Sequence, residues 1–461
     1  MAFFDALGSF GDRTALITDR DTVSYARLDE LAKAVGKAVP GRSLAFCLCK
    51  NDIGSIAGYL GLLQRGAVPV LIQPTVDGAL LAHLTDVYKP QYIWAQEGAF
   101  PWKTLAEEAG YALTETASAA DTPRMDPDLG LLLTTSGSTG SPKLVRQTYT
   151  NIQANAASIV DYLGIGPGDR PITTLPMHYT YGLSILHSHL LAGASMLLTE
   201  ATLMEKSFWN MLREGQATTF GGVPYTYEML MRLRFLRMEL PSLRYLTQAG
   251  GRLGKELHLA FAQGLREKGV RFVVMYGQTE ATARMSYVPA ERTVEKAGSI
   301  GIPIPGGAFT LIDDRGQPVT EPETTGELVY TGPNVTPGYA GSREDLANGD
   351  ERHGRLLTGD MARFDGDGYY YIVGRKKRFL KMFGSRVNLD EVEGLLKKQG
   401  WDCAVTGQDD HMKIFITAGD TAEVLDYVAA TTKLNRSAFT VKKLEKLPRN
   451  DAGKLIYGEL E

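Results

Sequence analysis

The residues best suited to chemistry lie in a segment rich in glycine, serine and threonine. Residues 131–143 read LLLTTSGSTGSPK, so an apolar run leads directly into a polar loop that ends in Pro-Lys. Glycines let backbone N–H groups turn toward an anion, hydroxyls add neutral donors, and a lysine adds positive charge. A flexible linker would not follow the apolar residues LGLLL, so the pattern predicts a polyphosphate-binding loop. Its candidate ligands are Thr134, Thr135, Ser136, Gly137, Ser138, Thr139, Gly140 and Lys143.

This loop differs from the common nucleotide-binding patterns. It lacks the Gly-Lys-Ser/Thr ending of GxxxxGK[ST], and no GxGxxG occurs in the chain. A kinase-like protein or P-loop ATPase is therefore disfavoured. An enzyme of either kind would release ADP from ATP, so release of AMP and pyrophosphate would exclude it.

The elements that must position the loop are short apolar runs alternating with amphipathic segments. Ser24 is placed to cap a helix with apolar residues at every third or fourth position, and a second helix is expected over 53–63. A helical face also follows the loop, over 152–163. Strands separated by helices predict an α/β fold with largely parallel sheets. The expected strands cover residues 43–49, 67–72, 129–133, 271–275 and 369–373.

The amino-acid composition changes twice in the remainder of the chain. From about Val288 onward glycine and proline become frequent, which indicates a loop-rich β region. A basic run that includes Lys377 then precedes a compact pattern, with helices expected near 390–398 and 421–431 and a strand over 412–417. We place a domain boundary at this run. The prediction is a large N-terminal domain of residues 1–375, with a β-rich subdomain, and a small mobile α+β C-terminal domain of residues 376–461.

The composition is that of a multidomain globular protein. The chain has 461 residues, of which 44% are hydrophobic and 22% charged, and one domain typically takes roughly 100–200 residues. Acidic residues number 53 and basic residues 49, so no whole-molecule attraction to nucleic acid or an anionic membrane is expected. The cysteines Cys47, Cys49 and Cys403 form neither a disulfide framework nor a metal-binding cluster. With no signal peptide and no apolar stretch of about 20 residues, a cytoplasmic protein without an integral membrane segment is expected.

The segment TTSGSTGSPK resembles the phosphate-loop signature of the adenylate-forming superfamily. That superfamily contains acyl- and aryl-CoA synthetases, adenylation domains of nonribosomal peptide synthetases, and firefly-type luciferases. Leu144 departs from the pattern, because glycine is usual at its position. Other segments resemble the family's motifs, in the family's order, over almost the whole chain: QAGGR at 248–252, YGQTE at 276–280, TGD at 358–360 and LPRNDAGKLI at 447–456.

The resemblance implies a nucleotide site. Tyr276 would stack on adenine and Glu280 would hold Mg²⁺, which prefers a carboxylate together with phosphate oxygens. Asp360 would accept hydrogen bonds from the two ribose hydroxyls, and Arg375 would lie in the same region. The other residues implied to line the site are Gly251, Arg252, Gly277, Gln278 and Thr279.

The segment LPMHYTYGLS, residues 175–184, resembles the family's acid-binding loop. The resemblance implies an acid pocket that contains Tyr179, Tyr181, Gly250 and Arg284, although for Arg284 an exposed position is an equal alternative. Many members have histidine where Tyr179 stands. Amino-acid-activating members carry an aspartate in this loop, and residues 175–186 contain none, which argues against an α-amino acid substrate. The histidines of the following helix, His187 and His189, are expected to be structural.

The C-terminal motifs imply moving parts. Lys377 falls at the family's hinge position, and Lys381, Gly384 and Arg386 fall where the family lines its thiol channel. Lys454 matches the essential lysine of the last motif. Arg378 stands where an acidic residue is common, and Tyr457 stands where arginine is commoner.

The sequence therefore predicts an ATP-dependent acid–thiol ligase. Lys143, Glu280 and Lys454 would be catalytic, with ATP, Mg²⁺ and coenzyme A as cofactors and a small carboxylic acid as substrate. The alternative is a stand-alone adenylation enzyme that loads an acyl, aryl or amino acid onto the phosphopantetheine of an acyl or peptidyl carrier protein. A catalytically dead binding module is disfavoured because Lys143, Glu280, Asp360, Arg375 and Lys454 are all present.

Overall fold

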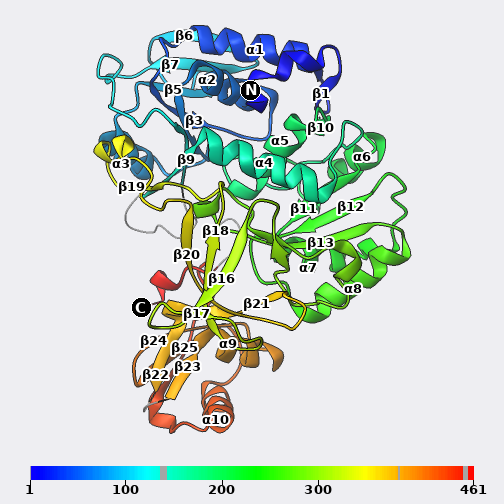
Figure 1. The fold of residues 1–461 in the computed structure, drawn as a ribbon, viewed down its shortest axis with the longest axis vertical. Coiled ribbons are helices and arrows are strands. Elements are labelled where there is room, and N and C mark those ends of the chain that lie inside the picture. Colours follow the sequence, from blue (N-terminus) through cyan, green and yellow to red (C-terminus); the bar gives the residue numbers. More distant parts are fainter. Residues whose placement is uncertain (1, 135–142, 383–384, 450–454, 461) are drawn as a thin grey trace. The chain divides into compact units, whose positions relative to one another are not determined.

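The computed structural model describes residues 2–134, 143–382, 385–449 and 455–460 (Figure 1). The chain divides into two compact units. Unit 1 comprises Met1–Ala308 and Tyr330–Leu356, and unit 2 comprises Phe309–Val329 and Leu357–Glu461. The division into residues 1–375 and 376–461 refers to a moving C-terminal part and remains a prediction.

The first large sheet of unit 1 has eight strands in the order β19-β9-β8-β4-β3-β5-β7-β6. Its centre is parallel, because β3 pairs in parallel with β4 and β5, and β4 with β8. Every residue of β3 and β4 is buried, as expected for parallel strands covered on both faces. The strands are β3 (Leu44–Leu48), β4 (Val68–Ile72), β5 (Tyr92–Gln96), β6 (Thr104–Glu108), β7 (Tyr111–Glu115), β8 (Leu129–Thr134), β9 (Leu144–Thr148) and β19 (Gly338–Ala340).

Helices α1 (Tyr25–Lys37) and α2 (Ile53–Arg65) pack closely on each other. The Ser24 side chain accepts a hydrogen bond from the backbone N–H of Arg27, which confirms the predicted cap. A Cβ added at Gly61 would lie 2.1 Å from the carbonyl oxygen of Ala32, so only glycine permits this approach. Unit 1 also contains α3 (Gly78–Tyr88), α4 (Tyr149–Leu163) and α5 (Thr180–Leu191).

The second large sheet of unit 1 has the order β11-β12-β13-β14-β15. Strands β11 (Thr219–Gly222), β12 (Tyr245–Gln248) and β13 (Arg271–Tyr276) are parallel, and the short β14 (Ser286–Tyr287) and β15 (Ile302–Pro303) add antiparallel pairs. Helix α6 (Lys206–Glu214) precedes β11, α7 (Pro224–Arg232) lies between β11 and β12, and α8 (Lys255–Glu267) lies between β12 and β13. A third, small sheet joins β10 (Met196–Leu197), β1 (Thr14–Ile17) and β2 (Thr22–Ser24).

Unit 2 begins with a β-rich part and ends with an α+β part. The first is a sheet in the order β17-β16-β18-β20-β21, formed by β16 (Ala308–Ile312), β17 (Pro318–Val319), β18 (Gly326–Thr331), β20 (Arg355–Phe364) and β21 (Tyr370–Arg375). The hairpin of β22 (Phe379–Met382) and β23 (Ser385–Asn388) then leads into a sheet of β24 (Cys403–Gln408), β25 (His411–Ile416) and β26 (Phe439–Lys443). Helices α9 (Leu389–Lys398) and α10 (Thr421–Thr432) lie where the sequence predicts them.

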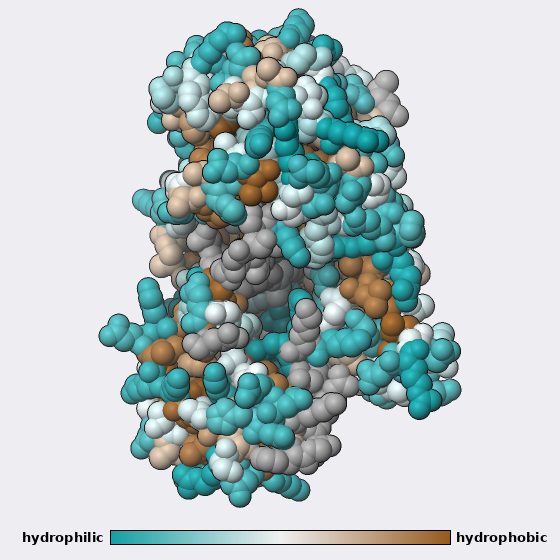
Figure 2. All heavy atoms as spheres, turned by 90° about the vertical axis from the view of Figure 1, so that its left-hand side faces the viewer, coloured by the Kyte–Doolittle hydropathy of each residue, from teal (hydrophilic) through white to brown (hydrophobic). Residues whose placement is uncertain are grey.

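The mixed α/β architecture confirms the predicted fold class. One local difference concerns the segment after the predicted phosphate loop. The sequence predicted only a helix there, whereas strand β9 comes first and helix α4 follows it. Hydrophilic side chains predominate on the face shown in Figure 2, with apolar atoms in limited patches, the distribution expected when apolar side chains fill the interior. None of the helices in the described ranges is long and apolar enough to cross a membrane.

Candidate functional site

The candidate acid and adenine residues gather at one edge of the second sheet of unit 1. Gln248 of β12 pairs with Val274 of β13, so the two parallel strands end side by side. Gly250 and Gly251 follow the end of β12, and Tyr276 is the last residue of β13. Ligands of open parallel sheets bind beyond the carboxyl ends of the strands, so this edge is where a site is expected.

The turn around Glu280 has a strained backbone. Thr282 and Ala283 both adopt positive φ values, 54° and 94°, which side-chain-bearing residues rarely do. A Cβ at Gly277 would lie 1.7 Å from the carbonyl oxygen of Ala283, so the turn closes only over glycine. The buried Asn334 amide holds the turn by donating to the carbonyls of Ala281 (2.8 Å) and Arg284 (3.0 Å). Strain of this kind persists only where the surroundings enforce it.

The Glu280 carboxylate is oriented by Tyr339, whose hydroxyl donates to Oε1 at 2.6 Å. Thr336 donates from its backbone N–H and its hydroxyl to the Glu280 carbonyl, both at 3.0 Å. The Arg352 guanidinium lies over the Tyr339 ring, 4.8 Å from its centroid. Burial, and next the Glu280 charge, raise the pKa of Tyr339 to about 12, so the hydroxyl remains a donor at neutral pH. Carboxylate oxygen Oε2 has no partner among the described residues, and it is therefore available to a cation.

The four predicted acid-pocket residues come together around the start of α5. The Tyr179 and Tyr181 rings are 6.5 Å apart, centroid to centroid. A Cβ at Gly250 would lie 2.6 Å from the Tyr179 hydroxyl. The Arg284 guanidinium lies 5.0 Å from the Tyr181 ring centroid. Only 2% of Arg284 is exposed, which excludes the surface position left open by the sequence.

The histidines of α5 are interior residues. Burial lowers the pKa of His187 to about 3 and that of His189 to about 4, so both are neutral at pH 7. Nε2 of His187 lies 2.8 Å from the Tyr59 hydroxyl, and Nδ1 of His189 lies 2.8 Å from the Ile185 carbonyl. The prediction that both residues are structural agrees with this burial.

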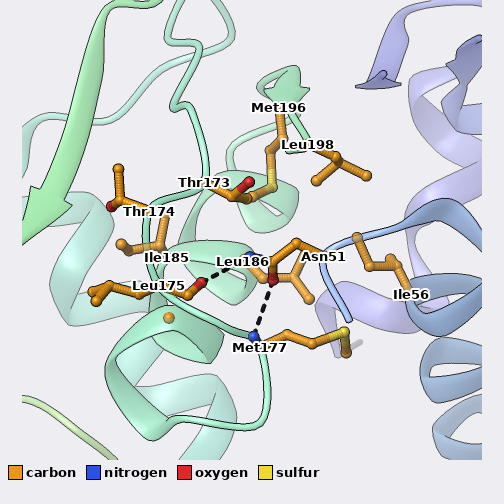
Figure 3. Close-up of a pocket in the computed structure, with 11 residues that line it drawn as sticks. Asn51, Ile56, Thr173, Thr174, Leu175, Met177, Ile185, Leu186, Met196 and Leu198 are labelled. Carbon is orange, nitrogen blue, oxygen red and sulfur yellow. Dashed lines mark hydrogen bonds between the residues drawn. The ribbon is translucent and has the colours of Figure 1, made fainter. Parts of the chain in front are cut away.

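The predicted acid-binding loop is anchored by Asn51, a residue that the sequence did not single out. Its Nδ2 donates to the Leu175 carbonyl at 3.1 Å, and its Oδ1 accepts from the Met177 N–H at 3.0 Å (Figure 3). The cavity beside this anchor is lined mainly by apolar side chains and measures about 10 Å³. That is close to the space one water requires, so the cavity packs the loop and does not hold a substrate.

The predicted phosphate loop is described only at its ends. Thr134 ends β8 and pairs with Leu144, the first residue of the antiparallel strand β9. Lys143, which is exposed, directly precedes that strand. The predicted ligands Thr135, Ser136, Gly137, Ser138, Thr139 and Gly140 lie outside the described residues.

Unit 2 brings the two predicted ribose residues together. Asp360 of β20 pairs with Arg375 of β21 in the ladder, and Nε of Arg375 lies 2.7 Å from Oδ1 of Asp360. Asp360 is buried, whereas 60% of the Arg375 side chain is exposed. The pair is thus a buried carboxylate held by a cation that solvent or a ligand can reach.

The remaining predicted residues of unit 2 are placed by their backbone alone. Lys377 lies in the 3₁₀ turn Lys376–Arg378, and Lys381 pairs with Arg386 across the β22–β23 hairpin. Gly384 and Lys454 lie outside the described residues, although Arg449 and Leu455 form a bridge on either side of 450–454. The roles assigned to all these residues remain predictions.

Comparison with known proteins identifies relatives over the whole chain. The family model described as AMP-binding enzyme matches residues 3–340. The chain is 30% identical to an oxalate–CoA ligase of Arabidopsis thaliana, covering 97% of this chain and 94% of that protein. It is 28% identical to a feruloyl-CoA synthase of an Amycolatopsis species, with the same coverage. The solved structure of an o-succinylbenzoate coenzyme A synthetase from Bacillus subtilis with AMP matches with a TM-score of 0.81 at 23% identity, covering 100% of this chain and 98% of that one, which confirms the fold.

Proposed function

The chain belongs to the family of AMP-binding enzymes, and from this premise we propose that it joins a carboxylic acid to coenzyme A at the expense of ATP. In the first half-reaction a carboxylate oxygen bonds to the α-phosphorus and the bond to pyrophosphate breaks. In the second, the thiol sulfur bonds to the acyl carbon, the bond to AMP breaks, and the thiol proton is released. The curated relatives described above are named for coenzyme A, which supports this acceptor over a carrier protein.

The observation that carries the proposal is the shared sheet edge of unit 1. Tyr181 and Arg284, which are predicted to line the acid pocket, lie near this edge, and Glu280, whose carboxylate is held by Tyr339, stands four residues before Arg284. An acid and the phosphates of ATP would therefore meet at the end of β13. Joining two anions is the electrostatic difficulty of the first half-reaction, and positive charge is the means to overcome it.

The residues present fit a magnesium ion at Glu280. Mg²⁺ binds through one or two carboxylates together with phosphate oxygens and water. Within the described ranges, one carboxylate oxygen of Glu280 has no partner, and no group of three or more His, Cys, Asp or Glu forms a self-sufficient metal site. Such an ion would come with ATP and neutralise phosphate charge. Lys143 and Lys454 would add charge from the protein, and Tyr276 would stack on the adenine.

The two half-reactions need different residues near the adenylate. Lys454 would neutralise charge while acyl-AMP forms, and it must then leave so that the thiol can enter past Gly384. A small domain that turns at Lys377 would present these groups in succession. Asp360, held by Arg375 at 2.7 Å, would accept the ribose hydroxyls in either orientation.

The test is acid-dependent exchange of labelled pyrophosphate into ATP, measured across aliphatic, aryl and hydroxy acids. Thioester formation is then compared with coenzyme A and with a phosphopantetheinylated carrier protein. We expect exchange with a subset of acids, thioester with coenzyme A, and AMP as the nucleotide product. Formation of ADP, or transfer to the carrier protein alone, would contradict the proposal.

A further inference from the structure

Arg284 is a buried cation that has no carboxylate partner in the described part of the chain. Its Nε donates to the Ser184 hydroxyl and its Nη1 to the Tyr162 hydroxyl, each at 3.1 Å. The Tyr181 ring lies 5.0 Å below the guanidinium. Among the residues that the structure describes, no Asp or Glu lies within ion-pairing distance of Arg284, and its Nη2 has no hydrogen-bond partner.

The titratable side chains described around Arg284 are uncharged or already paired at neutral pH. Burial raises the pKa values of Tyr162 and Tyr181, so both stay protonated. His189 is neutral because burial lowers its pKa to about 4. Asp169, whose charge reaches His189, already forms an ion pair with Arg244 at 2.9 Å. Among the described residues, the positive charge of Arg284 is thus met by two hydroxyls, the Met275 sulfur at 3.3 Å and an aromatic ring.

An interior position of this kind is costly for an arginine. Burying a charge is strongly unfavourable unless an opposite charge compensates it. The cation–π contact with Tyr181 recovers only part of that cost. An uncharged side chain of similar length would pack between α4 and α5 without the penalty. The arrangement is therefore suited to an anion that a ligand brings.

The anion that fits is a second carboxylate of the substrate, distant from the reacting one. The reacting carboxylate loses its charge when it becomes an acyl-adenylate. An arginine bound to it would stabilise the ground state more than the transition state and oppose the reaction. A second carboxylate keeps its charge through both half-reactions, so its pairing with Arg284 would persist. The relatives are named for oxalate, which has two carboxylates, and for ferulate, which has one. The class of acid is therefore inferred from Arg284 and its surroundings.

We propose that this enzyme activates dicarboxylic acids, and that Arg284 binds the carboxylate that does not react. The proposal rests on the ligase function proposed above and adds the class of acid. Arg284 would act as a receptor beside the Tyr181 ring, where a guanidinium can hold a carboxylate through its N–H groups. Monocarboxylic acids of the same shape would leave the buried charge unpaired.

The test uses pairs of acids that differ only in the far carboxylate. Suitable pairs are succinate with succinamate, adipate with adipamate, and terephthalate with 4-carbamoylbenzoate. Pyrophosphate exchange gives kcat/KM for each acid. The shift in thermal midpoint at high acid concentration gives binding without reaction. We expect the better-fitting dicarboxylates to exceed their monoamides by roughly 10- to 100-fold in kcat/KM, the range for a hydrogen bond to a charged group.

Two variants separate a receptor from a packing residue. Arg284→Met should remove the preference for the second carboxylate in both readouts. Arg271→Met is the matched control, because Arg271 also stacks on a tyrosine, Tyr245, at 5.1 Å, but it is exposed. That control should retain the preference. The comparison of each dicarboxylate with its monoamide is made on the wild-type enzyme. It therefore tests the preference for a second carboxylate even if Arg284→Met fails to fold.

The outcomes are distinguishable. A wild-type enzyme that uses monoamides as well as dicarboxylates, or an Arg284→Met enzyme that keeps the preference, overturns the inference while the ligase function stands. Selective thermal stabilisation by dicarboxylates without any pyrophosphate exchange would support the receptor and overturn the ligase function. If dicarboxylates give neither thermal stabilisation nor pyrophosphate exchange, the receptor role of Arg284 and the ligase function are both overturned.

Discussion

Replacing Tyr339 by phenylalanine tests whether the Glu280 carboxylate must be held in place to bind magnesium. The substitution removes only the hydroxyl that donates to Oε1 at 2.6 Å. The ring and its contact with Arg352, at 4.8 Å, are kept. Glu280 would still carry its charge, but its carboxylate would be free to rotate. We therefore expect a higher magnesium requirement with an intact fold.

The size of the effect follows from the geometry. A hydrogen bond to a charged acceptor contributes about 1.5–3 kcal/mol. Because 38% of Tyr339 is exposed, water would replace part of the lost contact, and about 1–2 kcal/mol is the appropriate range. This corresponds to roughly a 5- to 30-fold higher Mg²⁺ concentration at half-maximal rate. Since the pKa of Tyr339 is raised to about 12, the hydroxyl stays protonated through pH 10. The wild-type magnesium requirement should therefore show no tyrosine titration below that pH.

The assay is acid-dependent pyrophosphate exchange, titrated with Mg²⁺ at fixed ATP. Tyr371→Phe is the matched control, because the Tyr371 hydroxyl also donates to a carboxylate, that of Asp365 at 3.0 Å, and Arg363 lies 4.7 Å from its ring centroid. The control should leave the magnesium curve unchanged. An unchanged curve for Tyr339→Phe would show that Glu280 needs no orienting partner. A lower magnesium requirement would show that the hydroxyl competes with the ion.

Three further substitutions test the proposed roles in unit 2. Lys454→Ala should slow acyl-AMP formation roughly 10²–10³-fold and spare thioester formation from supplied acyl-AMP; an equal loss in both assays would contradict its role. Asp360→Ala should raise the KM for ATP in pyrophosphate exchange by roughly 10- to 100-fold, because a buried contact to ribose is lost; an unchanged KM would place Asp360 outside the nucleotide site. Lys377→Pro should permit acyl-AMP formation but slow thiol transfer, because proline fixes φ near −65°; circular dichroism would verify folding, and normal rates in both half-reactions would exclude a hinge at Lys377.

The parts of the fold that the sequence predicted well are those with a strong local signal. Strands β3, β4 and β8 are continuous apolar runs, and the observed bounds differ from the predicted ones by at most one residue at each end. Helix α1 was recognisable from its cap and its apolar periodicity. Strands β6 and β9 were missed because β6 is partly exposed and β9 contains polar residues. Their pairing with neighbours, rather than their composition, makes them strands.

The sequence predicted those candidate site residues that belong to a recognised motif. It did not predict the residues that contact the motif from distant parts of the chain. Glu280 belongs to the recognised segment YGQTE, but Asn334, Thr336 and Tyr339, which hold that segment, lie in a Gly- and Pro-rich stretch more than 50 residues later. Nothing local marks them. Arg284 could not be placed from the sequence for the same reason. The sequence left a buried and an exposed position as equal alternatives, and the packing of α4 and α5 determines that the residue is buried.

The two C-terminal departures from the family pattern are in contact in the structure. The Arg378 guanidinium lies 3.9 Å from the Tyr457 ring centroid. Its Nη2 lies 2.6 Å from Oε1 of Glu393, and the Tyr457 hydroxyl donates to Oε2 of the same carboxylate at 3.0 Å. Arg378 follows Lys377 directly, and Tyr457 lies three residues after Lys454. This contact therefore joins the segment proposed to turn to the segment proposed to carry the catalytic lysine.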